Sequence, residues 1–175
     1  MPPESSLLHM PIPDFVKSLR SKIGTELLQL PVASTFAYDD QGRLLLVQDI
    51  SSGLWSSPSG IIDPHELPSD AAVRETWEEA GVLVELTHIL GVFAGEHFSK
   101  TYDNGDQLAA VTTVFAARVI RGTPRPDHEE TSDARFFSPG EIDALSCSTP
   151  FLVIRKAVDQ NRSRAYFKPA TWQPS

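Results

Sequence analysis

The stretch GIIDPHELPSDAAVRETWEEAGV, residues 60–82, decides the fold because it holds the clearest helix of the chain. Ser69 is a good N-cap residue, and Pro68 stands just before it. Gly81 is a good terminator, since glycine adopts the left-handed backbone of a helix end without steric cost. These signals predict a helix over 69–81.

Three glutamates crowd into this helix. At about 100° per residue, Glu78 lies at about −60° and Glu79 at about +40° from Glu75, so the three carboxylates share one face. Like charges at these spacings repel by roughly a few tenths of a kcal/mol per pair, and the helix dipole adds to the cost. A solvated acidic face is the ordinary interpretation. A bound divalent cation is the other, because Mg²⁺ takes oxygen ligands and keeps waters for a phosphate.

The spacing of the wider stretch favours the cation. The pattern is G-x5-E-x7-R-E-x2-E-E-x-G followed by an apolar residue, here Val82. It resembles the signature box of the Nudix hydrolases, with seven matching positions within 22 residues. The matching positions are Gly60, Glu66, Arg74, Glu75, Glu78, Glu79 and Gly81.

The other predicted elements fit an α+β chain, and the resemblance implies a Nudix-type α/β/α sandwich with a mixed central sheet. A short helix is predicted over 14–24 with Asp14 as cap, and a last helix over 148–161 with Ser148 or Thr149 as cap. Extended segments alternate with turns between these helices. The predicted strands are 32–38, 43–49, 54–62, 83–95 and 108–120, and a strand that becomes a short helix lies within 134–145.

The chain is expected to have three parts. Residues 1–13 carry four prolines and predict a flexible N-terminal arm. Residues 14–160 are expected to form the Nudix hydrolase domain with its N-terminal helix. Residues 161–175 form a C-terminal tail, whose aromatic and proline residues predict docking on the body or on a partner. The N-terminal helix and the tail offer surfaces for a homodimer.

Composition restricts the function classes. The formal net charge is −8 and no basic run is present, which argues against a nucleic acid polymer as partner. No segment approaches the ~20 consecutive apolar residues of a membrane span, and the N-terminus lacks the features of a secretory signal. Cys147 is the only cysteine, which excludes an intrachain disulfide and fits a reducing compartment. We therefore expect a cytoplasmic protein with no membrane partner.

The resemblance implies a metal site. Nudix enzymes hydrolyse a nucleoside diphosphate linked to another moiety, and their box binds Mg²⁺ or Mn²⁺. By that likeness Glu75, Glu78 and Glu79 are metal ligands, and the backbone carbonyl of Ser59 is a further candidate. These residues make a small-molecule nucleotide diphosphate derivative the expected substrate.

Other residues of the box are expected to support these ligands. Glu66 is expected to brace the loop or Arg74 through charge-assisted hydrogen bonds. Gly60 is expected to permit a close backbone approach. Three positions depart from the family pattern: Thr76 stands where an aliphatic residue is preferred, His65 where many members have glycine, and Ser59 where glycine is frequent. None of these departures removes a metal-binding position.

The implied reaction is attack of water at phosphorus, which needs a general base. The candidates are Glu79 on the helix and Glu130 or Glu129 in the loop 122–133. Glu78 joins the catalytic set because its loss is expected to abolish most turnover. An exposed acidic loop remains the ordinary interpretation of Glu129 and Glu130.

Substrate specificity lies outside the box. Phe98 and Tyr102 are candidates to stack on a base, and Asn104 is a candidate to hydrogen-bond its edge. Core packing for Phe98 and hairpin-turn chemistry for Asn104 are the alternatives. Trp55 also has core packing as its favoured role. The arginines at 43, 118 and 125 are further phosphate candidates, and none is singled out by its spacing.

The favoured function is a divalent-metal-dependent pyrophosphohydrolase. Its substrate classes are a nucleotide sugar such as ADP-ribose, a nucleoside triphosphate or a dinucleoside polyphosphate. One alternative is a Nudix-fold module that binds a nucleotide without cleaving it. Another is an isomerase of prenyl diphosphates, which would need acid and base residues around a hydrocarbon pocket; Cys147 alone gives no sign of them.

Overall fold

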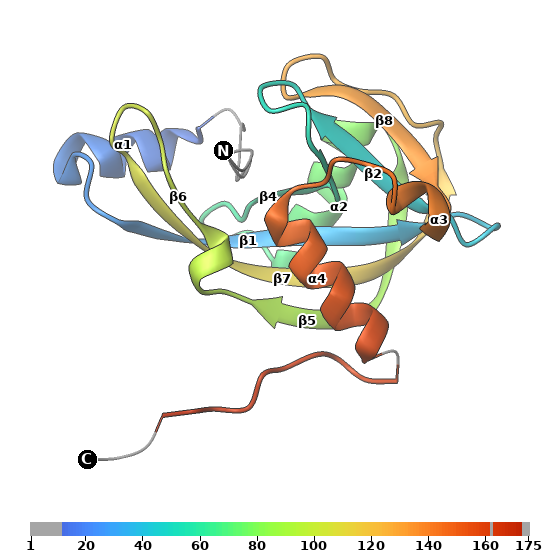
Figure 1. Ribbon diagram of the computed structural model, residues 1–175. Helices are drawn as coiled ribbons and strands as arrows, with labels where there is room; N and C mark the ends of the chain where they lie inside the picture. The colour runs from blue at the N-terminus through green and yellow to red at the C-terminus, as the bar shows by residue number, and fades with distance from the viewer. Residues whose placement is uncertain (1–11, 162, 173–175) are drawn as a thin grey trace.

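The computed structural model describes residues 12–161 and 163–172. Its centre is an eight-stranded mixed sheet in which β3, β2, β1, β7 and β5 follow one another (Figure 1). β4 pairs with β1, β6 with β7, and β8 with β2. The strands are β1 (Leu28–Tyr38), β2 (Leu44–Asp49), β3 (Trp55–Ser56), β4 (Ser59–Ile61), β5 (Leu83–Phe93), β6 (Ser99–Thr101), β7 (Gln107–Arg121) and β8 (Thr131–Phe137).

The sheet is mixed because β1 runs parallel to β7, whereas β5 pairs with β7 in the antiparallel direction. The helices are α1 (Asp14–Ile23), α2 (Pro68–Ala80), the 3-10 helix η1 (Glu96–Phe98), α3 (Pro139–Ile142) and α4 (Thr149–Gln160). Figure 1 shows α4 in front of the sheet and α2 behind it. The predicted sandwich with a mixed central sheet is therefore confirmed.

Alternation along β1 explains these two layers. Val32 and Phe36 belong to the large apolar cluster that contains Phe151 and Ile154 of α4. Ala33 and Thr35 point to the other face, where Ala33 packs with the small alanines of α2 and the hydroxyl of Thr35 contacts that of Thr76. Because successive side chains of a strand point to opposite faces, one buried strand serves both layers.

The structure corrects two predicted caps. α2 begins at Pro68, and the cap position is Leu67, so Ser69 is not the N-cap. Proline suits the first helical position because its φ is already helical and its missing N–H is not needed there. At α1 the cap position is Pro13, and the side chain of Asp14 pairs with Lys17 at 2.9 Å instead of capping.

The predicted helix ends and the last cap are correct. Gly81 follows α2 with φ 66° and ψ 21°, the left-handed conformation expected of a helix terminator. Ser148 caps α4, because its hydroxyl accepts the backbone N–H of Phe151. The 3-10 helix η1 and the short strand β6 were not predicted. They lie between the predicted strands 83–95 and 108–120.

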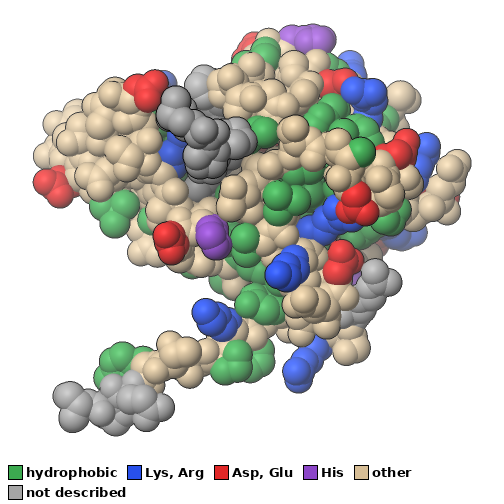
Figure 2. All heavy atoms as spheres, in the orientation of Figure 1, with side chains coloured by type: hydrophobic (Ala, Val, Ile, Leu, Met, Phe, Trp, Pro, Cys, Tyr) green, Lys and Arg blue, Asp and Glu red, His purple; other side chains and the backbone are tan. Residues whose placement is uncertain are grey.

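The C-terminal tail contacts the body at one point. The backbone N–H of Tyr166 donates to Leu90 at 2.7 Å, and its ring stacks on Phe93 with centroids 5.1 Å apart. Beyond this contact the tail extends away from the body, and Trp172 is 78% exposed. Apolar side chains line the projecting tail in Figure 2. The predicted arm at 1–13 lies almost wholly outside the described residues. No helix among these residues is long and apolar enough to cross a membrane.

Candidate active site

Helix α2 places two of its glutamates against the sheet. Glu75 and Glu79 are buried, with 6% and 7% of their surfaces exposed, whereas Glu78 is exposed at the edge of the same face. Carboxylates are seldom buried unless they are paired or coordinate a metal. The burial of two carboxylates one helical turn apart therefore calls for positive charge or hydrogen-bond donors at this site.

Arg74 is the nearest positive charge. One of its terminal nitrogens lies 2.7 Å from Glu75 and 3.0 Å from Glu78. Its Nε and its other terminal nitrogen contact the two carboxylate oxygens of Glu66 at 2.8 and 2.9 Å. The carbonyl of Ile61 accepts a further N–H at 3.2 Å. The expectation that Glu66 braces Arg74 agrees with this geometry, and the same contact lowers the pKa of Glu66.

The backbone of residues 59 and 60 completes the floor of the site. The N–H of Ser59 donates to a carboxylate oxygen of Glu79 at 3.2 Å. Gly60 is buried, and a Cβ built on it would overlap the carboxylate of Glu75. The close approach expected at Gly60 is therefore present, and any larger residue would displace Glu75.

The loop before β8 adds a further carboxylate. Glu130 is half-buried, whereas its neighbour Glu129 is exposed. Burial, followed by repulsion from Glu75, raises the pKa of Glu130 to about 8. Burial raises the pKa of Glu75 to about 7, despite the opposing effect of Arg74. Burial and then the charges of Glu75 and Glu130 raise the pKa of Glu79 well above its ordinary value.

These residues fit a divalent cation by charge and by donor type. Glu75, Glu79 and Glu130 repel one another at partly or fully buried positions, and all offer the oxygen ligands that Mg²⁺ and Mn²⁺ prefer. Within the part of the chain that the structure describes, no three acidic, histidine or cysteine side chains converge as a preformed metal site. In this structure the carboxylates have donors as partners instead: Arg74 contacts Glu75 and Glu78, and the Ser59 N–H donates to Glu79.

Comparison with known proteins decides the family. The family model described as "NUDIX domain" matches residues 28–154. The chain belongs to the Nudix hydrolase family. The structure of a MutT protein from Methanosarcina mazei Go1 has the same fold, with a TM-score of 0.63 at 18% identity, and the match covers 79% of this chain and 99% of that one.

Curated Nudix relatives carry more than one activity in their names. An isopentenyl-diphosphate Delta-isomerase from Streptomyces avermitilis is 34% identical over 124 residues, which cover 67% of this chain and 61% of that protein. A putative 8-oxo-dGTP diphosphatase from Bacillus subtilis is 28% identical over 110 residues, which cover 63% of this chain and 67% of that protein. The chain therefore matches only part of the length of these relatives.

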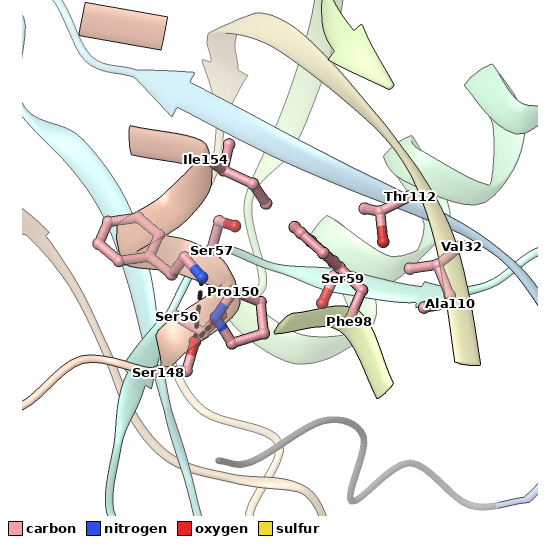
Figure 3. A pocket seen from close by; sticks show the side chains of 11 residues that line it. Val32, Ser56, Ser57, Ser59, Phe98, Ala110, Thr112, Ser148, Pro150 and Ile154 are labelled. Atoms are coloured by element: carbon pink, nitrogen blue, oxygen red, sulfur yellow. Dashed lines mark hydrogen bonds between the residues drawn. The ribbon is translucent and has the colours of Figure 1, made fainter. Parts of the chain in front are cut away.

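A cavity of about 40 Å³ opens beside the Nudix box, between β1, β7 and α4 (Figure 3). Phe98 and Ser59 line it together, so the structure brings these two predicted residues to one place. No sequence pattern indicates the rest of the lining, because isolated serines and apolar residues are common everywhere. The other lining residues are Val32, Ser56, Ser57, Ala110, Thr112, Ser148, Pro150, Phe151 and Ile154.

The two other substrate candidates do not line this cavity. Asn104 is exposed, and its side chain contacts both the N–H and the carboxylate of Asp106, which is the turn chemistry that was the alternative. Tyr102 is half-buried, with the amine of Lys100 4.7 Å from its ring centre. Burial raises the pKa of its phenol to about 12.

Three other residues singled out in the sequence, Trp55, Arg43 and Arg118, have structural partners. Trp55 is buried and meets Phe137 edge-to-face at 4.8 Å, as core packing predicts. Arg43 pairs with Asp39, and Arg118 pairs with Glu85. His65 is exposed with φ 71°, Arg125 is also exposed, and Cys147 is half-buried.

Proposed function

We propose that this Nudix protein is a divalent-metal-dependent pyrophosphohydrolase that cleaves a nucleoside diphosphate linked to another moiety. The observation that carries the proposal is the burial of Glu75 and Glu79 close to Glu130, with Arg74 as the cation that contacts Glu75. Such crowding costs stability in the folded protein. A site that must bind a cation and a polyanionic diphosphate gives a functional reason for that cost.

Four groups would hold the metal: the carboxylates of Glu75, Glu78 and Glu79 and the backbone carbonyl of Ser59. The family implies Mg²⁺ or Mn²⁺. When bound, the cation neutralises charge on the diphosphate oxygens and lowers the pKa of a bound water. Arg74 would release Glu75 and Glu78 and keep its contact with Glu66.

The reaction is substitution at phosphorus. The water oxygen forms a bond to phosphorus, the bridging P–O bond breaks, and the water proton passes to a carboxylate. Glu130 is the favoured acceptor, because it is half-buried beside Glu75 and does not contact Arg74, while Glu79 on the helix is the other candidate. A carboxylate whose pKa lies near neutrality both accepts and returns a proton readily.

The cavity beside Ser59, about 40 Å³ in volume, has room for a small group of the substrate next to the diphosphate and not for a whole nucleoside. Its lining offers hydroxyl groups and apolar walls, whereas Phe98 is only 3% exposed and stacks on Phe93 in the core, which is the alternative role for that residue. Nucleotide sugars, nucleoside triphosphates and dinucleoside polyphosphates remain the substrate classes to test. Tyr102 and Asn104 remain candidates for parts of the substrate that reach beyond this cavity.

The isomerase relative supplies a second candidate function, because it is 34% identical over 124 residues. An isomerase of prenyl diphosphates must protonate and deprotonate carbon inside a hydrocarbon pocket. The lining of the cavity contains no His, Cys, Asp or Glu side chain. This favours hydrolysis. The complete set of box glutamates likewise favours catalysis over a module that only binds a nucleotide.

The decisive experiment is a substrate panel with Mg²⁺ or Mn²⁺, reading released phosphate, pyrophosphate and nucleoside monophosphate. Glu79→Gln and Glu78→Gln should each lose most turnover while the circular dichroism spectrum stays unchanged. Glu26→Gln, an exposed site far from the box, is the matched control and should keep full activity. Full activity in Glu79→Gln would show that the assigned metal site is wrong. Tight nucleotide binding without any product would favour the binding module.

Some expectations still rest on the sequence alone. They are the cytoplasmic location, the absence of nucleic acid and membrane partners, the homodimer, and the division into arm, domain and tail. The exposed aromatic side chains of the tail support a contact with a partner, which size-exclusion chromatography with light scattering would test.

A further inference from the structure

The loop that carries Glu130 also satisfies the end of the box helix. An α-helix leaves its last carbonyls without partners inside the helix, so other groups must supply the donors. The hydroxyl of Thr131 lies 2.9 Å from the carbonyl of Glu79, and the N–H of Arg125 donates to the carbonyl of Ala80 at 2.9 Å. The two ends of the loop are thus bound directly to the turn of helix that holds Glu79.

Asp127 organises the loop between these two contacts. One of its carboxylate oxygens accepts the backbone N–H groups of Glu129 and Glu130 at 3.0 Å and that of Thr131 at 2.9 Å. The hydroxyl of Thr131 lies 3.0 Å from the same oxygen and accepts the N–H of Asp127 at 3.1 Å. His128, inside this turn, has φ 64°, a conformation that the surrounding hydrogen bonds must hold.

Glu130 is therefore fixed on three sides. Its N–H is held by Asp127, and its carbonyl accepts the N–H of Ile50 at 2.9 Å. The next residue, Thr131, is buried against the carbonyl of Glu79. The backbone of Glu130 is thus held by Ile50 on one side. Toward Glu79 it is held by a short path of hydrogen bonds through two side chains, Asp127 and Thr131.

We propose that Asp127 and Thr131 are positioning residues, which hold Glu130 beside Glu79 and so fix the acceptor of the water proton relative to the metal-binding helix. This inference rests on the proposed function, because it takes the role of Glu130 from there. Neither side chain is assigned a contact with the substrate. Thr131 has only one hydroxyl proton, so it serves the carbonyl of Glu79 or the carboxylate of Asp127 at any moment, and both contacts need the hydroxyl.

The test compares Thr131→Val with Thr131→Ser. Valine has the shape of threonine without its hydroxyl, whereas serine keeps the hydroxyl. Because a misplacement of about 1 Å can cost roughly 10²-fold in rate, Thr131→Val should lower kcat by about 10-fold or more with little change in KM. Thr131→Ser should stay within about 3-fold of the wild type. Thr87→Val is the matched control, since Thr87 also donates to a backbone carbonyl but lies in β5, away from the loop.

A double-mutant cycle separates positioning from general damage. If Thr131 acts through Glu130, adding Thr131→Val to Glu130→Gln should lower kcat by less than about 3-fold further. If the two losses multiply, the inference is overturned. Should Thr131→Val fail to fold by circular dichroism, Asp127→Ala replaces it in the same cycle, because it removes the acceptor that holds the N–H of Glu130.

A second measurement does not depend on turnover. Mn²⁺ binding, followed by the electron paramagnetic resonance of unbound Mn²⁺, should weaken several-fold in Thr131→Val and in Glu130→Gln, and the double variant should be no weaker than Glu130→Gln. Loss of one nearby carboxylate lowers the attraction for a cation, which is the physical basis of this expectation. Unchanged Mn²⁺ affinity in Thr131→Val would overturn the inference. A wild-type protein that binds Mn²⁺ but cleaves no substrate of the panel would contradict the proposed function instead.

Discussion

Replacing Thr76 with valine is expected to lower the free energy of unfolding by about 1–3 kcal/mol. The hydroxyl of Thr76 lies 2.7 Å from the carbonyl of Ala72, one turn earlier in α2, and 2.6 Å from the hydroxyl of Thr35 in β1. Thr35 and Thr76 are fully buried. Since Thr76 gives its single proton to Ala72, Thr35 must donate to Thr76. Valine removes that acceptor and leaves a buried hydroxyl of Thr35 without a partner.

The same geometry predicts an asymmetry between the two threonines. Thr35→Val leaves Thr76 donating to Ala72, so its cost should be about 1 kcal/mol or less. The double variant removes both hydroxyls with groups of the same shape, which can be nearly neutral. Adding Thr35→Val to Thr76→Val should therefore restore stability. For a domain of this size, each kcal/mol corresponds to a shift of roughly 2–4 °C in Tm.

Urea denaturation of the wild type, the two single variants and the double variant measures all four free energies. Thr76→Val should unfold at lower urea than Thr35→Val, with equal m-values. Two results would refute the assigned direction of the hydrogen bond. One is that the losses of unfolding free energy of the two single variants add in the double variant, and the other is that Thr35→Val loses more than Thr76→Val. Burial of the Thr76 methyl group alone predicts a small effect at this position. The hydrogen bond to Thr35 predicts a larger one.

Two further predictions concern the site. In the folded protein the pKa is about 7 for Glu75 and about 8 for Glu130, above the ordinary 4.5 of a glutamate. The stability that these two groups contribute to the fold is therefore fully present below about pH 4.5 and is lost as the pH rises to about 8. The metal-free protein should therefore have a lower Tm near pH 8 than near pH 5, and excess Mg²⁺ should raise Tm more at the higher pH; equal Mg²⁺ shifts would contradict this. Gly60→Ala should displace Glu75 and weaken Mn²⁺ binding several-fold with an unchanged circular dichroism spectrum, whereas Gly140→Ala, where an added Cβ meets open space, should bind Mn²⁺ like the wild type.

The sequence was sufficient to predict helix α2 and the two faces of β1, because the signals for both are local. The 3.6-residue spacing of the box residues, the terminator at Gly81 and the alternation in residues 32–38 each follow from backbone geometry. The cap of α2 was predicted wrongly because two signals competed one residue apart. Pro68 is better placed than Ser69 to start a helix, since it needs no hydrogen bond of its own.

The contacts of the site could be predicted only in part. The box predicts that Glu66 meets Arg74, because both positions belong to one motif. It does not predict that Thr131 contacts the carbonyl of Glu79, since 52 residues separate them and a threonine at the start of a strand is ordinary. The serines of the cavity are a similar case, because they come from β3, β4, the segment between these strands and the cap of α4. Such sites arise from tertiary packing, for which a single sequence carries no periodic signal.

Arg74 explains how the acidic helix is stable before a cation binds. A guanidinium has five N–H donors, and all five of this one have an acceptor: two go to Glu66, one to Ile61, and one each to Glu75 and Glu78. A divalent cation that takes Glu75 and Glu78 would remove only two of these contacts. The three that remain keep Arg74 in place, ready to receive both carboxylates when the cation leaves. Lysine, with three donors on a flexible stem, could not hold Glu66 through two oxygens and serve the helix as well.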